Sequence, residues 1–174
     1  MTKEFVPHLD HHGWLYRKAI LPVLALLRMG ASPEKLAWSL AIGLAIGINP
    51  ILGSTTALSL ALAFAFKLNV PASQITTHLS YPLELAFVLP LIRLGARIFH
   101  TAPIPLDPKQ LIAAARTAPI QLSKSLWMWE WHALIVYLPI AAILIPLTAL
   151  AITPTLRKAL AKMEAHGHHG KPQK

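Results

Sequence analysis

The chain has 174 residues, of which 55% are hydrophobic and only 13% are charged, and its net charge is +9. This length fits one domain, and the composition differs from that of an ordinary soluble protein. Because the sequence contains no cysteine, it has no disulfides, thiolate metal sites or cysteine nucleophiles.

The basic residues lie mostly beside apolar stretches, and they do not form a stripe with base-stacking aromatic residues. We therefore expect no nucleic-acid partner. Anionic phospholipid headgroups suit a pattern of cations beside apolar segments. Membrane lipids are thus the predicted partners, and a homo-oligomer remains open.

The first thirty residues predict a polar tail followed by a short helix. Met1 to Gly13 is polar, whereas Trp14 to Met29 is basic and apolar, which is typical of a helix lying at the membrane interface. Gly30 is suited to end that helix. Ser32 and Pro33 then predict the cap and first position of the next one.

An apolar run with an interrupted middle follows. Leu36 to Phe66 contains no charged residue and no histidine, and a membrane span needs only about 20 residues. Pro50 disfavours helix at Asn49, and Gly53 adds a second weak point. Broken backbone at membrane depth often marks a transport site. The sequence predicts two half-helices, 36–48 and 54–66, each roughly 20 Å long.

Small residues recur every four positions along the first half-helix, at Ser39, Gly43 and Gly47. Small residues let two helix backbones approach closely within lipid. We interpret this row as a helix-packing face. Its partner could lie in the same chain or in another protomer.

A second apolar block, Leu68 to Ile92, is interrupted at Ser80-Tyr81-Pro82 and resembles the first in outline. Paired broken segments are typical of internally repeated transporters, so a structural repeat is one alternative. We predict that both blocks are re-entrant. Lys35, Lys67, Arg93 and Arg97 would then share one side of the membrane.

The last third predicts an amphipathic segment and one crossing. Asp107 to Ser125 is too polar to span, whereas Ala133 to Pro154 is uncharged and follows a tryptophan belt. A single crossing would place Arg157 opposite Lys35, against the positive-inside rule, so a second crossing or a final hairpin is required. The predicted divisions are an N-terminal tail, a helical membrane domain and a basic C-terminal tail, at residues 1–13, 14–156 and 157–174.

The residues from Ser32 to Gly95 also carry a family resemblance. Ser32-Pro33-Glu34-Lys35-Leu36-Ala37, Pro50 and Leu68-Asn69-Val70-Pro71-Ala72 follow one another in a distinctive order. This part of the chain resembles the bacterial family catalogued as domain of unknown function 2062. The resemblance implies a small, proline-broken, helical membrane domain in bacteria without an established activity. Members of the family usually have Asn-Pro at the second break, where this chain has Tyr81-Pro82. Any role of that asparagine is therefore taken by the Tyr81 hydroxyl or is absent here.

Polar residues near the breaks are the candidate site. Glu84 is the one acid between Lys35 and Asp107, and intramembrane carboxylates usually face a cavity or a partner, although a helix-dipole role near the headgroups is equally consistent. Ser54 and Thr55 open a half-helix whose free amides could hold a phosphate, or they could simply satisfy the broken backbone. The predicted substrate-binding residues are Asn49, Ser54, Thr55, Tyr81 and Glu84.

Together these patterns predict an all-α, integral membrane protein with proline-broken, re-entrant helices, located in the bacterial cytoplasmic membrane and crossing it more than once. We expect it to bind or transport an anionic lipid or small anion. The alternative is a membrane scaffold that docks a partner through Gly43 and Gly47. We find no catalytic motif, so we expect no enzyme and no cofactor. The histidines near both ends lack fixed ligand geometry, so we expect no metal.

Overall fold

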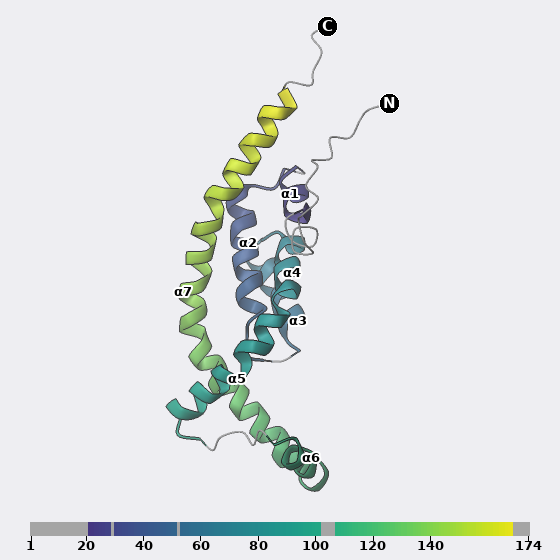
Figure 1. The fold of residues 1–174 in the computed structure, drawn as a ribbon, viewed down its shortest axis with the longest axis vertical. Coiled ribbons are helices and arrows are strands. Elements are labelled where there is room, and N and C mark those ends of the chain that lie inside the picture. The colour runs from purple at the N-terminus through teal and green to yellow at the C-terminus, as the bar shows by residue number, and fades with distance from the viewer. Residues whose placement is uncertain (1–20, 29, 52, 102–106, 169–174) are drawn as a thin grey trace.

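Every regular element in the part of the chain that the structure describes is a helix. The computed structural model describes residues 21–28, 30–51, 53–101 and 107–168 (Figure 1). The all-α class is therefore confirmed over these residues. The helices are α1 (Leu21–Arg28), α2 (Pro33–Ile46), α3 (Thr55–Ala65), α4 (Val70–Leu79), α5 (Tyr81–Ile98), α6 (Pro108–Thr117) and α7 (Pro119–His168).

Local capping explains where several helices begin. Ser32 accepts a hydrogen bond from the Lys35 amide at 3.3 Å, and Pro33 occupies the first turn of α2, as predicted. Asn69 caps α4 in the same way, with its Oδ1 3.0 Å from the Ala72 amide. Gly30 ends α1 at a φ of +88°, a left-handed conformation that glycine adopts without strain.

The first broken block is a helical hairpin. Its helices agree with the predicted half-helices to within a few residues at each end. The Asn69 amide, just after α3, donates to Ser39 Oγ in α2 at 2.8 Å. The chain therefore returns to the end of the molecule at which α2 began, next to Lys35 and Lys67.

The second block bends but does not turn back. α4 and α5 meet at an angle of 63°, and Ser80 is the single residue between them. One residue is too few for a reversal, since connections between antiparallel helices need about 2–5 residues. The second block is therefore not a hairpin, and it does not repeat the geometry of the first.

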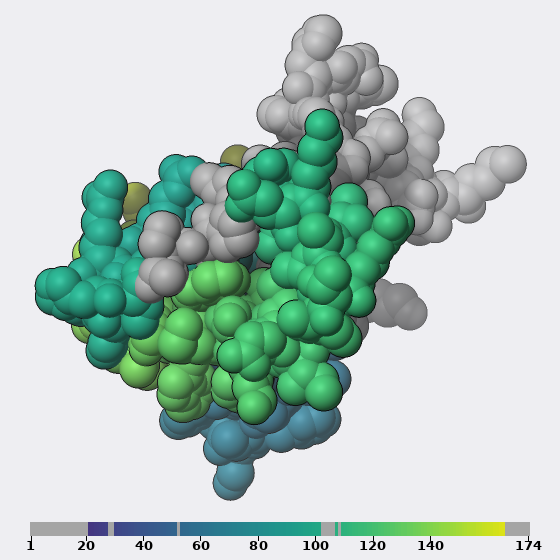
Figure 2. Space-filling model, turned by 90° about the horizontal axis from the view of Figure 1, so that it is seen from below, coloured from purple at the N-terminus to yellow at the C-terminus, as the bar shows by residue number. Residues whose placement is uncertain are grey.

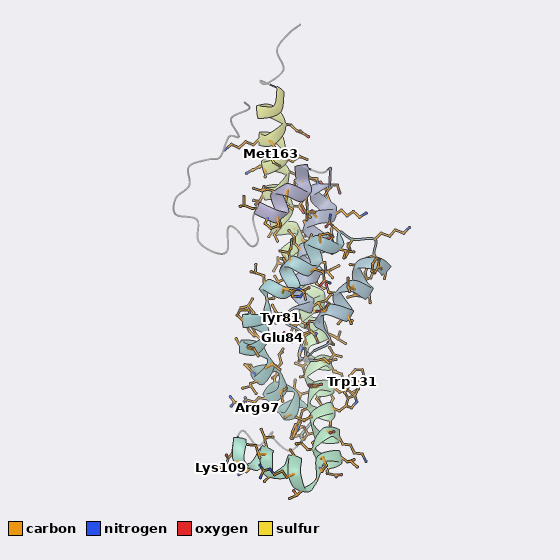
Figure 3. The ribbon with its side chains drawn as sticks, turned by 90° about the vertical axis from the view of Figure 1, so that its right-hand side faces the viewer. Tyr81, Glu84, Arg97, Lys109, Trp131 and Met163 are labelled. Atoms are coloured by element: carbon orange, nitrogen blue, oxygen red, sulfur yellow. The ribbon has the colours of Figure 1, made fainter. Side chains whose placement is uncertain are left out.

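α5 continues toward the opposite end of the molecule and packs against the first part of α7. A Cβ placed on Gly95 would lie 2.9 Å from the carbonyl carbon of His132, so the two helices touch at their backbones. Figure 3 shows Arg97 well below Tyr81 and Glu84, on the way to Lys109. The expectation that Arg97 shares an end with Lys35 and Lys67 is therefore wrong.

α7 is a 50-residue helix with Pro139, Pro146 and Pro154 in its interior. At 1.5 Å per residue it is about 75 Å long, and it lies alongside both α2 and α5 (Figure 1). It runs without interruption through Arg157, where the sequence predicts the start of a tail. Leu156 is buried in a core cluster with Leu27 and Leu36, so the helix still packs at that point.

α6 closes the lower end of the molecule. Seen from below in Figure 2, α5 and α6 lie on either side of the first turns of α7. The predicted polar tail at residues 1–13 and the first half of the predicted interfacial helix lie outside the described residues.

Candidate functional site at the helix breaks

The two helix breaks touch each other. A Cβ on Gly47, at the end of α2, would lie 2.6 Å from Ser80 Cβ and 2.7 Å from the Thr77 carbonyl oxygen. Gly43 stands equally close to α4, where a Cβ would lie 2.9 Å from Ser73 Cα. The predicted small-residue face therefore packs within this chain, and it brings both breaks to one place.

Asn49 and Ser54 hold the first break together. Asn49 is 2% exposed, and its Oδ1 accepts from the Ile51 amide at 2.8 Å while its Nδ2 donates to Ser54 Oγ at 3.2 Å. Ser54 Oγ in turn donates to the Ile51 carbonyl at 2.8 Å. Gly53 completes the turn at a φ of +81°. These two predicted ligands thus serve first to satisfy the interrupted backbone.

The other predicted site residues differ in exposure. Thr55 is buried at 3% exposed, whereas Tyr81 is 38% exposed and its ring centroid lies 5.3 Å from that of His78. Tyr81 therefore faces the surface near the second break. Figure 3 shows Tyr81 and Glu84 close together along α5, midway between the two ends of the molecule.

Glu84 is buried at 6% exposed, and its carboxylate makes no hydrogen bond or ion pair with another described residue. It lies on the same helical face as Val88, Leu91 and Gly95, at spacings of four, three and four. Val88 and Leu91 pack in the core cluster that α5 shares with α7. The face that carries Glu84 is therefore turned into the protein.

A cluster of buried hydroxyl groups adjoins the breaks, and sequence reasoning missed it. Ser59, Ser73 and Thr77 are each 0% exposed. Ser59 Oγ lies 2.8 Å from Ser73 Oγ and 3.0 Å from Thr77 Oγ1, which is also 3.0 Å from the Gly43 carbonyl oxygen. The cluster ties α3, α4 and α2 together. The four-residue spacing of Ser73 and Thr77 was the available signal.

Tyr137 is a second residue that the sequence did not single out. It is buried in α7, and its hydroxyl donates to the Ala45 carbonyl in the last turn of α2. That carbonyl lies in the last turn of the helix, where it also accepts from the Ile48 amide at 3.2 Å. The bond places the middle of α7 directly against the first break.

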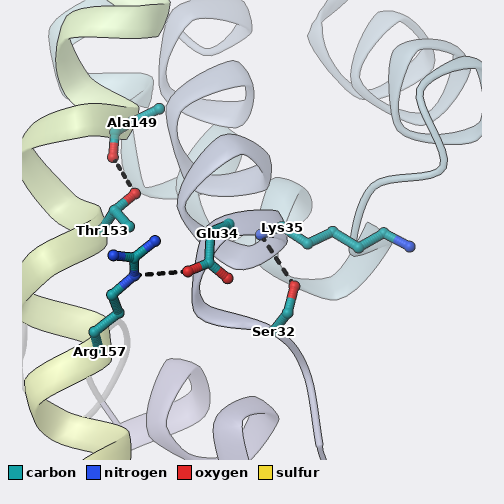
Figure 4. A network of polar contacts seen from close by, with 6 residues as sticks. All are labelled: Ser32, Glu34, Lys35, Ala149, Thr153 and Arg157. Carbon is teal, nitrogen blue, oxygen red and sulfur yellow. Dashed lines mark hydrogen bonds and ion pairs between the residues drawn. The ribbon is translucent and has the colours of Figure 1, made fainter.

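An ion pair joins the start of α2 to α7 at the far end of the hairpin (Figure 4). Arg157 Nε lies 2.7 Å from Glu34 Oε1, and both side chains are largely exposed. Backbone hydrogen bonding at the helix start, and then the Arg157 guanidinium, lower the pKa of Glu34. The Lys35 side chain points away from this pair in Figure 4.

No group of three or more metal-ligating side chains occurs among the described residues. His8, His11, His12 and His169 lie outside them. The site therefore consists of a turn with internal hydrogen bonds, a buried hydroxyl cluster and a carboxyl group that has no partner within the described part of the chain.

Residues 20–166 match the family model described as an uncharacterized protein conserved in bacteria, domain of unknown function 2062. The chain belongs to this family. The family membership expected from residues 32–95 is confirmed. The match also extends past the two broken blocks to include α6 and most of α7. No curated protein and no solved structure matches the chain.

Proposed function

We propose that this chain is an integral, multi-pass protein of the bacterial cytoplasmic membrane. Among the described helices, α7 is long and apolar enough to cross a membrane, and the bent α4–α5 pair would be a second crossing if it forms one span. A core helix of a soluble protein would be mostly buried, but only 17% of the apolar window of α7 is buried. Large apolar side chains are also exposed on α3 and α5, including Phe64 at 70% and Leu85 at 69%.

In this arrangement the α2–α3 hairpin enters from one side and returns to it. α4–α5 crosses the membrane once, and α7 crosses back. Arg157 then returns to the side of Lys35, which supplies the second crossing that the charge distribution requires. The break at the tip of the hairpin lies at membrane depth, where broken backbone must be satisfied by protein, as Asn49 and Ser54 do.

We further propose that the paired breaks bind, and move across the membrane, an anionic lipid headgroup or a small anion. The observation that carries this proposal is the buried Glu84 carboxyl, which has no described partner beside two touching breaks. A charged group in the apolar part of a membrane is costly, so an acid held there usually serves a substrate or a proton.

We propose different roles for the predicted residues. Glu84 and the Tyr81 hydroxyl are the groups left to meet a substrate, whereas Asn49, Ser54 and Thr55 shape the break. A carboxylate repels an anion at close range. An anion therefore occupies this site only while Glu84 holds a proton, and a protonated carboxyl donates a hydrogen bond.

Reconstituted vesicles test the proposal. The probes are a fluorescent phosphatidylglycerol, followed by dithionite bleaching for lipid movement, and inorganic phosphate for anion uptake. We expect Glu84→Leu to slow one of the two at least tenfold and Glu84→Gln, which resembles the protonated acid, to retain most of the rate. Leu85→Ala, at an exposed neighbour, is the matched control.

Wild-type rates in folded Glu84→Leu and Pro50→Ala proteins would rule out the break site. We favour this proposal over a scaffold that docks a partner through Gly43 and Gly47, because α4 packs against that face. A partner could not reach that face without displacing α4.

A further inference from the structure

An apolar groove lies between the α2–α3 hairpin and α7, away from the helix breaks. It has a volume of about 450 Å³. Every side chain that lines it is hydrophobic, and the groove is open to the exterior: Trp38 is 40% exposed and Phe66 is 62% exposed. The lining residues are Trp38, Ile42, Leu62, Phe66, Leu68 and Ile145.

Two lysines stand at the same end of this groove. Lys35, Trp38 and Ile42 are spaced by three and four residues, so they form one stripe along α2 with the lysine at its outer end. Lys35 is therefore only about 4.5 Å along the helix axis from the groove. Lys67 follows Phe66 and precedes Leu68, which both line the groove.

Neither lysine forms an ion pair with an acid in the described ranges. The carboxylate nearest in sequence, Glu34, is bound to Arg157, and Lys35 points away from that pair (Figure 4). Lys67 is exposed at the end of α3, where its left-handed φ of +51° marks the reversal of the chain. Two positive charges that have no acidic partner among the described residues thus border an apolar groove.

We propose that this groove binds one acyl chain of an anionic phospholipid, whose phosphate meets Lys35 and Lys67. A hydrocarbon chain fits a lining without polar side chains, and a phosphate supplies the negative charge that the two lysines lack. The inference rests on the membrane placement proposed above but not on the break site. The bound lipid would fill the space between the hairpin and α7.

Brominated lipids test this occupant, because bromine quenches a nearby tryptophan. In a variant that keeps only Trp38, with Trp14, Trp127, Trp129 and Trp131 changed to phenylalanine, we compare brominated phosphatidylglycerol with brominated phosphatidylcholine in mixed micelles. Each lysine strengthens binding to an anionic lipid about fivefold, so both together predict a preference of about 25-fold. If the variant does not fold, the difference between the wild-type chain and Trp38→Phe isolates the same signal.

Two variants remove the expected preference for different reasons. Lys35→Gln with Lys67→Gln removes the phosphate contacts, and Ile145→Phe fills the groove while both lysines stay. Lys109→Gln with Lys124→Gln makes the same change in charge at the opposite end and should leave the preference intact. A chain that keeps only the exposed Trp127 reports the general lipid belt and should show little preference.

Equal quenching of Trp38 by both lipids, or a preference that survives the removal of both lysines, would overturn the proposal. The Glu84→Leu variant distinguishes a failure of the groove proposal from a failure of the proposed transport site at the helix breaks. If Glu84→Leu loses transport but keeps the Trp38 preference, both sites stand. If Glu84→Leu leaves both transport and the Trp38 preference unchanged, the groove proposal is supported and the break-site proposal is rejected.

Discussion

At the scale of single residues, Glu34 interacts favourably both with the start of its own helix, α2, and with a distant helix, α7. It lies in the first turn of α2, where a carboxylate complements the positive helix end, and it also binds Arg157 of α7. Both effects favour the charged form and lower its pKa, with backbone hydrogen bonding the larger of them.

The lowered pKa makes the stability of this contact depend on pH. A carboxyl whose folded-state pKa is depressed stabilises the fold fully above its ordinary value of 4.5 and loses that contribution as pH falls through the lower folded value. We expect the melting temperature in detergent to fall between pH 5 and pH 3 more steeply in the wild-type chain than in Glu34→Gln. Because the pair is exposed, the difference should shrink at high salt.

Arg157→Gln is the matched variant. Its melting temperature should fall with pH less steeply than that of the wild-type chain but more steeply than that of Glu34→Gln, because the backbone contribution to the Glu34 pKa remains. Identical pH profiles for the wild-type chain and Glu34→Gln would show that the pair does not stabilise the fold.

Asn49 shows at the same scale why residue type alone did not reveal its role. An asparagine before proline in an apolar run is consistent with a ligand or with a turn former. Its partners Ile51 and Ser54 are close in sequence, so the turn could have been predicted, but its burial to 2% exposed could not.

At the scale of helices, the contact between α2 and α4 depends on the absence of side chains at Gly43 and Gly47. A Cβ at Gly43 would collide with Thr76 Oγ1 and with the carbonyl oxygen of Ser73, which is backbone and cannot rotate away. Overpacking of this kind typically costs about 1–3 kcal/mol.

We expect Gly43→Ala to lower stability by about that amount and Gly43→Leu to prevent folding, measured as melting temperature by fluorescence-detected gel filtration. Ala61→Leu, at an exposed position of α3, is the control and should change little. A Gly43→Leu protein with wild-type stability would mean that the close contact between α2 and α4 is absent.

The two broken blocks differ because of the length of their connections. Eight residues separate α2 from α3, which allows a reversal, whereas Ser80 alone separates α4 from α5. Both blocks have a polar residue before proline, so the local signal is the same in each. The spacing of the flanking helices, and not the proline, decides whether the chain turns back.

At the scale of the whole molecule, the membrane placement proposed above predicts which residues share a side of the membrane. Lys35, Lys67 and Arg157 lie at one end, and Arg97 and Lys109 lie toward the other (Figures 3 and 4). The chain contains no cysteine, so single cysteines can be placed at these positions without background.

We expect membrane-impermeant thiol reagents to label positions 35, 67 and 157 from one side and positions 97 and 109 from the other. Ile143, which is 67% exposed on α7, should not react when changed to cysteine, because the proposed membrane placement surrounds it with lipid. Labelling of 35 and 97 from the same side would mean that the second block is re-entrant after all.

The sequence by itself determined the helical class, the family, the position of the first break and the starts of α2 and α4. These follow from local rules: apolar runs, caps and prolines act over a few residues, and the chain need not be folded to read them. Tertiary structure alone decided that the glycine face packs on α4, that the second block continues past its bend, and that Glu84 is enclosed. Those outcomes depend on which distant helices meet, and no local pattern in one chain specifies that pairing.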